Sequence, residues 1–215
     1  MDLINSSSKL IPLEREYEGW IISNIENYFE TLGISYEIRA LSPNEENNYP
    51  ADELLQFPES FKVFGLQMKR PSLNAKNKSL KQWTDLKWKL SNPPHQYQKI
   101  LDNNCIYYCL PAFTNRAFRK QSLSHCYFWR PHKTTPKSHT FYLKGKNDIS
   151  DSMKWRTFIN EVFKCKIGVK FDNQKILSRY LKINSVLNRE SRVGDNQSEI
   201  EEENTTLYLV GVELP

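Results

Sequence analysis

The sequence predicts a single α/β domain over residues 1–215, built on a mixed central β-sheet that is flanked by helices. With 215 residues, of which 39% are hydrophobic, the chain can bury one sizeable core. Segments with the apolar spacing of helices alternate with segments of strand character. Residues 105–110 carry no charge, as expected of a strand that is covered on both faces.

The chain has the features of a cytoplasmic protein. Residues 1–9 lack the apolar run that follows the basic start of a signal peptide, and no window approaches the roughly 18 uncharged apolar residues of a membrane span. The four cysteines show no tight pairing, which fits a reducing compartment. We therefore expect a cytoplasmic location and no membrane partner. The oligomeric state is left open, a homo-oligomer included.

Residues 13–32 are predicted to form an amphipathic helix that ends at Gly33, a residue suited to a helix C-cap. Glu14 and Glu18 lie one turn apart, at the edge of the apolar stripe that should face the core. A carboxylate buried there needs a partner, because burying a lone charge is costly. The alternative is a side chain that simply reaches water. The stripe itself contains Trp20, Ile21, Ile25, Tyr28, Phe29 and Leu32.

Three short strands are predicted next, over residues 34–41, 50–55 and 61–70, and Pro71 should end the third. In the third strand one face is apolar and the other is small or polar. The apolar face has Phe64, Leu66 and Met68, and the polar face has Gly65, Gln67 and Lys69. The second strand carries Asp52. Since consecutive short elements are joined by a turn, we expect Asp52 to lie near the Gln-x-Lys pair at one end of a sheet.

The rest of the chain continues the alternation of helices and strands. Two short helices are predicted, one capped by Ser79 and including Leu80, Trp83, Leu86 and Leu90, the other opened by Asn92-Pro93-Pro94 with Gln96 near its start. Strands are predicted at 105–110, 124–129, 139–144 and 207–214, and helices at 152–164 and 174–187, with an acidic loop at 188–206.

The net charge of +5 is unevenly distributed along the chain. Residues 1–60 carry 3 Lys and Arg against 12 Asp and Glu, whereas residues 61–146 carry 17 Lys and Arg against Asp85 and Asp102 alone. Residues 147–215 are nearly balanced, with 10 against 11. A block with so strong a positive charge indicates a surface for a polyanion. The alternative is a solvated basic face with no ligand.

An acidic helix, an aspartate on a short strand and Gln-x-Lys on the next strand resemble the PD-(D/E)xK, or restriction-endonuclease-like, nuclease superfamily. The resemblance covers about residues 13–130, and residues 150–215 would add helices, the acidic loop and a terminal strand. Glu18 matches the helix glutamate of the family, with Glu14 as the alternative acid. Pro50-Ala-Asp52 matches its Pro-Asp portion with one residue inserted. Gln67-Met-Lys69 matches the final motif with glutamine in the acidic position, and Gln96 matches a glutamine that some branches place beside the substrate.

The resemblance implies a metal-dependent endonuclease that hydrolyses DNA, with Mg²⁺ or Mn²⁺ as cofactor. Asp52 and Gln67 would supply oxygen ligands, Glu18 would bind through water or a second ion, and Lys69 would orient the attacking water. Arg70, Lys76 and Lys78, beside the site in the sequence, would contact nucleic acid together with Gln96. By analogy with similar small nucleases, the chain is expected to be the effector subunit of a prokaryotic antiviral defence system, with protein partners there.

Two other functions fit the same residues. The first is a catalytically inactive module of the same fold that holds nucleic acid through residues 61–146, and the second is a structural subunit that docks an acidic protein. A zinc site made by Cys105, Cys109 and Cys126 with the nearby histidines is disfavoured. If Cys105 and Cys109 lie on the same face of one strand, they are about 13 Å apart, too far to share a metal.

Overall fold

The computed structural model describes residues 3–4, 11–34, 36, 38–40, 62–73, 86–90, 96–132, 140–142, 149–164, 166–170 and 207–210. The helical elements are α1 (Glu14–Leu32), α3 (Gln96–Asp102), the 3₁₀ segment η3 (Arg116–His125) and α4 (Trp155–Phe163). The strands are β1 (Ile38–Ala40), β2 (Lys62–Met68), β3 (Ser72–Leu73), β4 (Leu86–Lys89), β5 (Ile106–Pro111), β6 (Cys126–Trp129), β7 (Thr140–Tyr142), β8 (Met153–Lys154), β9 (Val169–Lys170) and β10 (Leu207–Val210). Among these residues, no helix has the length and apolar character needed to cross a bilayer.

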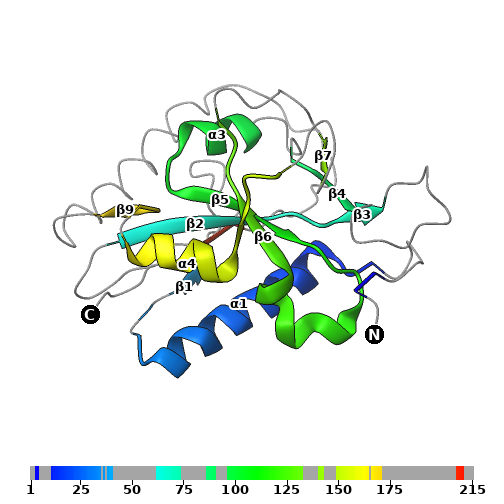
Figure 1. Ribbon diagram of the computed structural model, residues 1–215, viewed down its shortest axis with the longest axis horizontal. Helices are drawn as coiled ribbons and strands as arrows, with labels where there is room; N and C mark the ends of the chain where they lie inside the picture. The colour runs from blue at the N-terminus through cyan, green and yellow to red at the C-terminus, as the bar shows by residue number, and fades with distance from the viewer. Residues whose placement is uncertain are drawn as a thin grey trace, which may run out of the picture.

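A mixed central sheet organises the fold, with strand order β1-β10-β2-β5-β6-β8 (Figure 1). β2 and β5 run parallel, whereas β10 pairs antiparallel with both β1 and β2, and β6 pairs antiparallel with both β5 and β8. β9 pairs antiparallel with the first residues of β2. β3, β4 and β7 form a smaller antiparallel sheet. The predicted class, a mixed central sheet flanked by helices, is confirmed.

The first predicted helix is present as α1. The helix begins after Leu13, whose backbone N–H donates to Glu16 Oε2 at 2.8 Å. It ends at Gly33, which has a φ of 66° and donates its N–H to the Glu30 carbonyl at 3.1 Å. This left-handed conformation is one that glycine adopts without strain, so the sequence sets the end of the helix.

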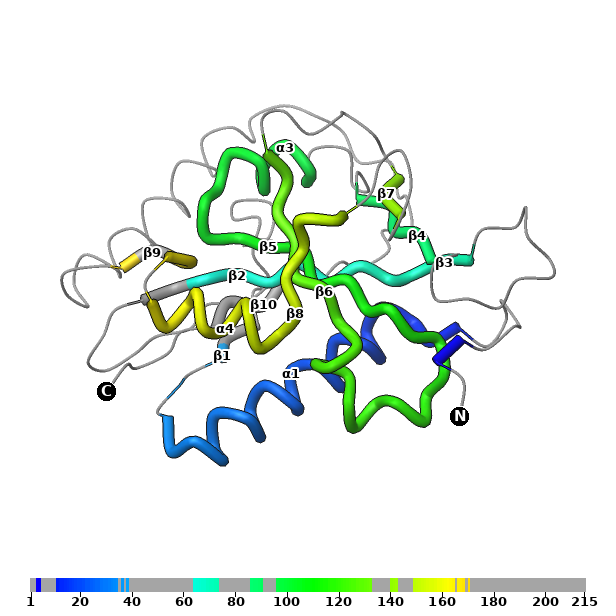
Figure 2. The backbone as a smooth tube through the Cα atoms, in the orientation of Figure 1, coloured from blue at the N-terminus to red at the C-terminus, as the bar shows by residue number. Residues whose placement is uncertain are grey.

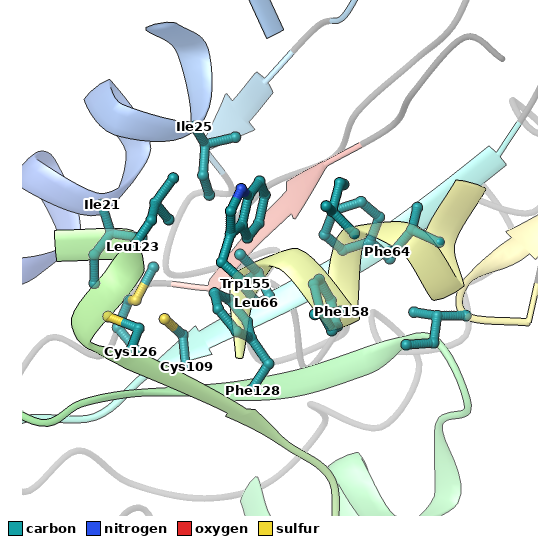
Figure 3. Close-up of a cluster of buried hydrophobic side chains, with 14 of the residues drawn as sticks. Ile21, Ile25, Phe64, Leu66, Cys109, Leu123, Cys126, Phe128, Trp155 and Phe158 are labelled. Atoms are coloured by element: carbon teal, nitrogen blue, oxygen red, sulfur yellow. The ribbon is translucent and has the colours of Figure 1, made fainter. Parts of the chain in front are cut away.

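Two apolar clusters cover the two faces of the central sheet. On one face α1 and α4 pack on β2, β5 and β6, as Figure 3 shows for Ile21, Ile25, Phe64, Leu66, Phe128 and Phe158. On the other face α3 and the small sheet cover β5, with Trp88, Ile100, Ile106, Tyr108 and Phe141 among the buried side chains. The predicted alternation along β2 is confirmed, since Phe64, Leu66 and Met68 are all fully buried on the α1 side.

The prediction of a helix through Leu86 and Leu90 is wrong for the described residues of that segment. Residues 86–89 form strand β4, in which Leu86 and Trp88 are buried and Lys89 is exposed. The physical reason is that the apolar residues at positions 86, 88 and 90 also fit a period of two, and pairing with β3 and β7 selects it. The predicted helix at 174–187, the acidic loop at 188–206 and the strand at 50–55 lie outside the described residues.

The premise that Cys105 and Cys109 lie on one face of a strand is also wrong. Cys105 precedes β5 and belongs to the cluster under α3, whereas Cys109 belongs to the cluster under α1 and α4. A single metal could not bind both, because the sheet lies between them. The two thiols are buried, and burial raises the pKa of each. A thiol held in its protonated form is a poor ligand for zinc.

Candidate functional site

Hydrogen bonds connect the N-terminal end of α1 to the residues that follow β2. The backbone N–H of Arg70 donates to Glu14 Oε2 at 2.7 Å, and Arg70 Nη2 donates to the Ile11 carbonyl at 2.9 Å. The backbone N–H of Lys69 still donates to the Cys109 carbonyl at 3.2 Å, so Lys69 continues the ladder with β5. These bonds set the first turn of the helix beside the residues that follow the strand.

Glu18 lies one turn further along α1, on the side of the helix that faces the sheet. α1 and β2 run in opposite directions (Figures 1 and 3). The four residues from Glu14 to Glu18 span about 6 Å of helix. That length equals about two residues of strand, counted back from Arg70. The helix therefore places Glu18 level with Met68 on the α1 face of the sheet, whereas the alternation along β2 assigns Lys69 to the same face as Gln67.

Glu18 and Lys69 are 5% and 4% exposed. Within the part of the chain that the structure describes, no other Asp, Glu, Lys or Arg is buried to this degree. Neither side chain lacks an interaction. Ionised side chains are rarely buried unless they are paired or functional, because removing them from water is costly. The two charges that the fold buries are thus both residues selected from the sequence as site candidates.

Gln67 places an amide at the same end of β2, on the opposite face of the sheet from α1. It is 1% exposed, and its Oε1 accepts a hydrogen bond from Gln96 Nε2 at 2.5 Å. Gln67 Nε2 donates to the Met68 carbonyl at 3.3 Å. The expected proximity of Gln96 to the motif strand is therefore present, because α3 carries Gln96 at its first residue.

The oxygens of this site fit a hard divalent cation. Mg²⁺ prefers carboxylate and amide oxygens, and Gln67 supplies an amide oxygen. Gln96 Oε1 is buried, and no donor reaches it within the described residues, so an oxygen beside Gln67 is available to a cation or to its water. No group of three His, Cys, Asp or Glu side chains suited to a metal occurs in the described ranges.

Asp52 lies outside the described residues, as do Lys76 and Lys78. Both edges of β2 are occupied where Gln67 lies, by β10 on one side and by β5 on the other. Arg70 is half-buried and directs its guanidinium to the Ile11 carbonyl, which differs from the open loop position expected of a nucleic-acid contact.

A buried tyrosine fixes α1 to the segment that follows β5. Tyr17 is fully buried, and its hydroxyl donates to the Phe113 carbonyl at 2.6 Å. Burial raises the pKa of Tyr17, so the phenol stays protonated and keeps this bond at neutral pH. The helix that carries Glu14 and Glu18 is therefore held from two sides, by β2 and by the chain around Phe113.

Exposed cations on η3 were not among the site residues selected from the sequence. Arg116, Arg119 and Lys120 are exposed there, on a segment that packs along α1. The sequence feature that marks them is the absence of any Asp or Glu between Asp102 and Asp148. The predicted polyanion surface covered the whole block of residues 61–146 and did not separate its exposed residues from its buried ones.

Comparison of the chain with protein-family profiles, with curated protein sequences and with solved structures finds no significant match.

Proposed function

We propose that the protein is a metal-dependent endonuclease that hydrolyses DNA phosphodiester bonds, with a restriction-endonuclease-like core. The observation that carries the proposal is the burial of two charged side chains, Glu18 on α1 and Lys69 directly after β2. The fold bears the cost of two charges at the positions that the PD-(D/E)xK resemblance selects. Gln67 and Gln96 add two amides at the same end of the strand.

In this proposal Asp52 and Gln67 would hold the cation, and Glu18 would act through a metal-bound water or a second ion. Mg²⁺ or Mn²⁺ bound there would polarise a phosphate oxygen and lower the pKa of water. Lys69 orients the attacking water and compensates the negative charge that builds on the phosphate. Gln96 holds the Gln67 amide in place, because its Nε2 donates to Gln67 Oε1.

A plasmid-cleavage assay with and without Mg²⁺ tests the proposal. We expect the wild type to cleave only with the cation, and Glu18→Gln, Asp52→Asn and Lys69→Met each to lose cleavage by at least about a hundredfold. Lys170→Met, a change of the same type at an exposed residue of β9, is the matched control and should cleave as the wild type does. Cleavage by Lys69→Met at the wild-type rate would exclude the assigned site.

The two other functions predict different results in the same experiments. An inactive binding module shifts DNA in an electrophoretic assay but does not cleave it under any divalent cation. A structural subunit that docks an acidic protein does neither. A role as the effector subunit of a prokaryotic antiviral defence complex is part of the proposal. It predicts that cells expressing the Lys69→Met variant lose protection against phage that the wild type confers.

A further inference from the structure

The 3₁₀ segment η3 has an anchored backbone and exposed cationic side chains, and it lies beside α1. η3 begins at the Asn115 cap, where Asn115 Oδ1 accepts from the Ala117 N–H at 3.0 Å. The segment is anchored on α1, because Asn24 Nδ2 donates to the Arg119 carbonyl at 2.9 Å and the Ser122 hydroxyl donates to the Trp20 carbonyl at 3.3 Å. Its backbone is therefore fixed, whereas its exposed side chains project from it.

The exposed face of η3 is cationic. Arg119 and Lys120 are exposed, and no acidic side chain of the described residues pairs with either. Arg116 is paired through its Nη2 with Glu16 Oε2 at 2.8 Å. Lys154 of β8 extends the same charge, since its Nζ lies 3.5 Å from the carbonyl of Ser124. The surface defined by Arg119 and Lys120, called the η3 surface below, thus has two cations with no counter-charge among the residues that the structure describes.

η3 packs along α1 from Glu16, which pairs with Arg116, to Asn24, whose Nδ2 donates to the Arg119 carbonyl. The Arg116–Glu16 pair joins η3 to the first turn of α1, whereas Glu14 of that turn binds the Arg70 N–H. Figure 2 shows η3 running along the N-terminal half of α1, with β9 at the opposite end of the molecule. Asn24 lies about 9 Å along the helix axis from Glu18, so α1 connects the η3 surface to the candidate site.

We propose that the η3 surface binds the phosphate backbone of duplex DNA and holds it against the candidate site. This inference rests on the proposed function for the identity of the ligand. A phosphate contact needs a cation whose position is fixed by the backbone and whose charge is not neutralised by a carboxylate. The anchored backbone of η3 meets the first condition, and Arg119 and Lys120, which pair with no described acidic side chain, meet the second. Successive phosphates of one DNA strand are spaced by about 3.4 Å along the axis, so two neighbouring cations can each contact one phosphate.

The test compares two double charge reversals of equal size. Arg119→Glu/Lys120→Glu changes the η3 surface, and Lys164→Glu/Lys170→Glu makes the same change at exposed residues at the end of α4 and on β9. Affinity for a fluorescein-labelled 20-bp duplex is measured by anisotropy in EDTA over a range of salt. We expect the η3 variant to bind at least about tenfold more weakly and its log–log salt slope to be smaller by about 1.8, at roughly 0.9 per phosphate contact. The control variant should keep the wild-type slope.

Every outcome of this comparison decides the proposal. Equal loss in both double variants, or none in either, overturns it, because the effect is then one of net charge. Tighter binding to an RNA duplex of the same sequence overturns the assignment to DNA. Unfolding midpoints of both variants, measured in urea, should match the wild type. If the wild type binds DNA through η3 but never cleaves it, the proposed nuclease function fails while the assignment of the η3 surface stands. If the wild type cleaves DNA and both double variants bind it equally well, the assignment of the η3 surface fails while the nuclease function stands.

Discussion

The burial of Glu18 and Lys69 at one end of β2 predicts that their contributions to stability depend on each other. Lys69→Met keeps the length of the side chain and removes the ammonium, so the Glu18 carboxylate, 5% exposed, loses the one buried cation among the described residues. Glu18→Gln does the converse to Lys69, which is 4% exposed. A buried charge that loses its counter-charge is costly, and where the two charges form a direct ion pair the loss is about 3–5 kcal/mol.

The double variant removes both charges together and should recover much of that loss. Replacing both members of a buried pair by neutral groups of similar shape is often nearly neutral. We therefore expect a coupling free energy on the order of 2 kcal/mol, within the roughly 0.5–3 kcal/mol found for residues in one polar network. The assay is urea unfolding of the wild type, the two single variants and the double variant at pH 7 in EDTA. Additivity to within about 0.5 kcal/mol would refute the arrangement, because it would mean that the two side chains do not interact.

Three other outcomes follow from the same structure. Gln67→Glu should tighten Mn²⁺ binding by at least about tenfold in a calorimetric titration, because a charged carboxylate replaces the neutral amide. Equal affinities of the variant and the wild type would show that this side chain does not face the metal. Tyr17→Phe should lower the free energy of unfolding by about 1–3 kcal/mol, because the buried Phe113 carbonyl loses its donor, and an unchanged urea midpoint would contradict this. The pKa of His125 is lowered, chiefly by burial and then by Lys154, so the unfolded chain binds the proton more readily. Stability should therefore fall as the pH drops below about 6.5, and His125→Gln should flatten that dependence in pH-dependent thermal melts.

Local patterns in the sequence were sufficient to predict α1, β2 and β5. The apolar residues of α1 repeat at helical spacing up to Gly33, whose left-handed backbone requires no tertiary contact to be favoured. The alternation from Phe64 to Lys69 determined which side chains face α1 and which face α3, since successive residues of a strand point to opposite faces. The edge position of Glu18 on the apolar stripe left open whether its carboxylate is buried or reaches water, and the fold buries it.

Tertiary structure alone decided which strands became neighbours and which periodicity prevailed. Leu86, Trp88 and Leu90 fit both a helix and a strand, and only pairing with β3 and β7 selected the strand. β10 lies between β1 and β2 although more than a hundred residues of chain separate it from them. Such pairings depend on loop closure and on the competition between edges, which no local pattern records. The approach of Gln96 to Gln67, and of η3 to the first turn of α1, has the same physical origin: each follows from how distant segments pack on one sheet.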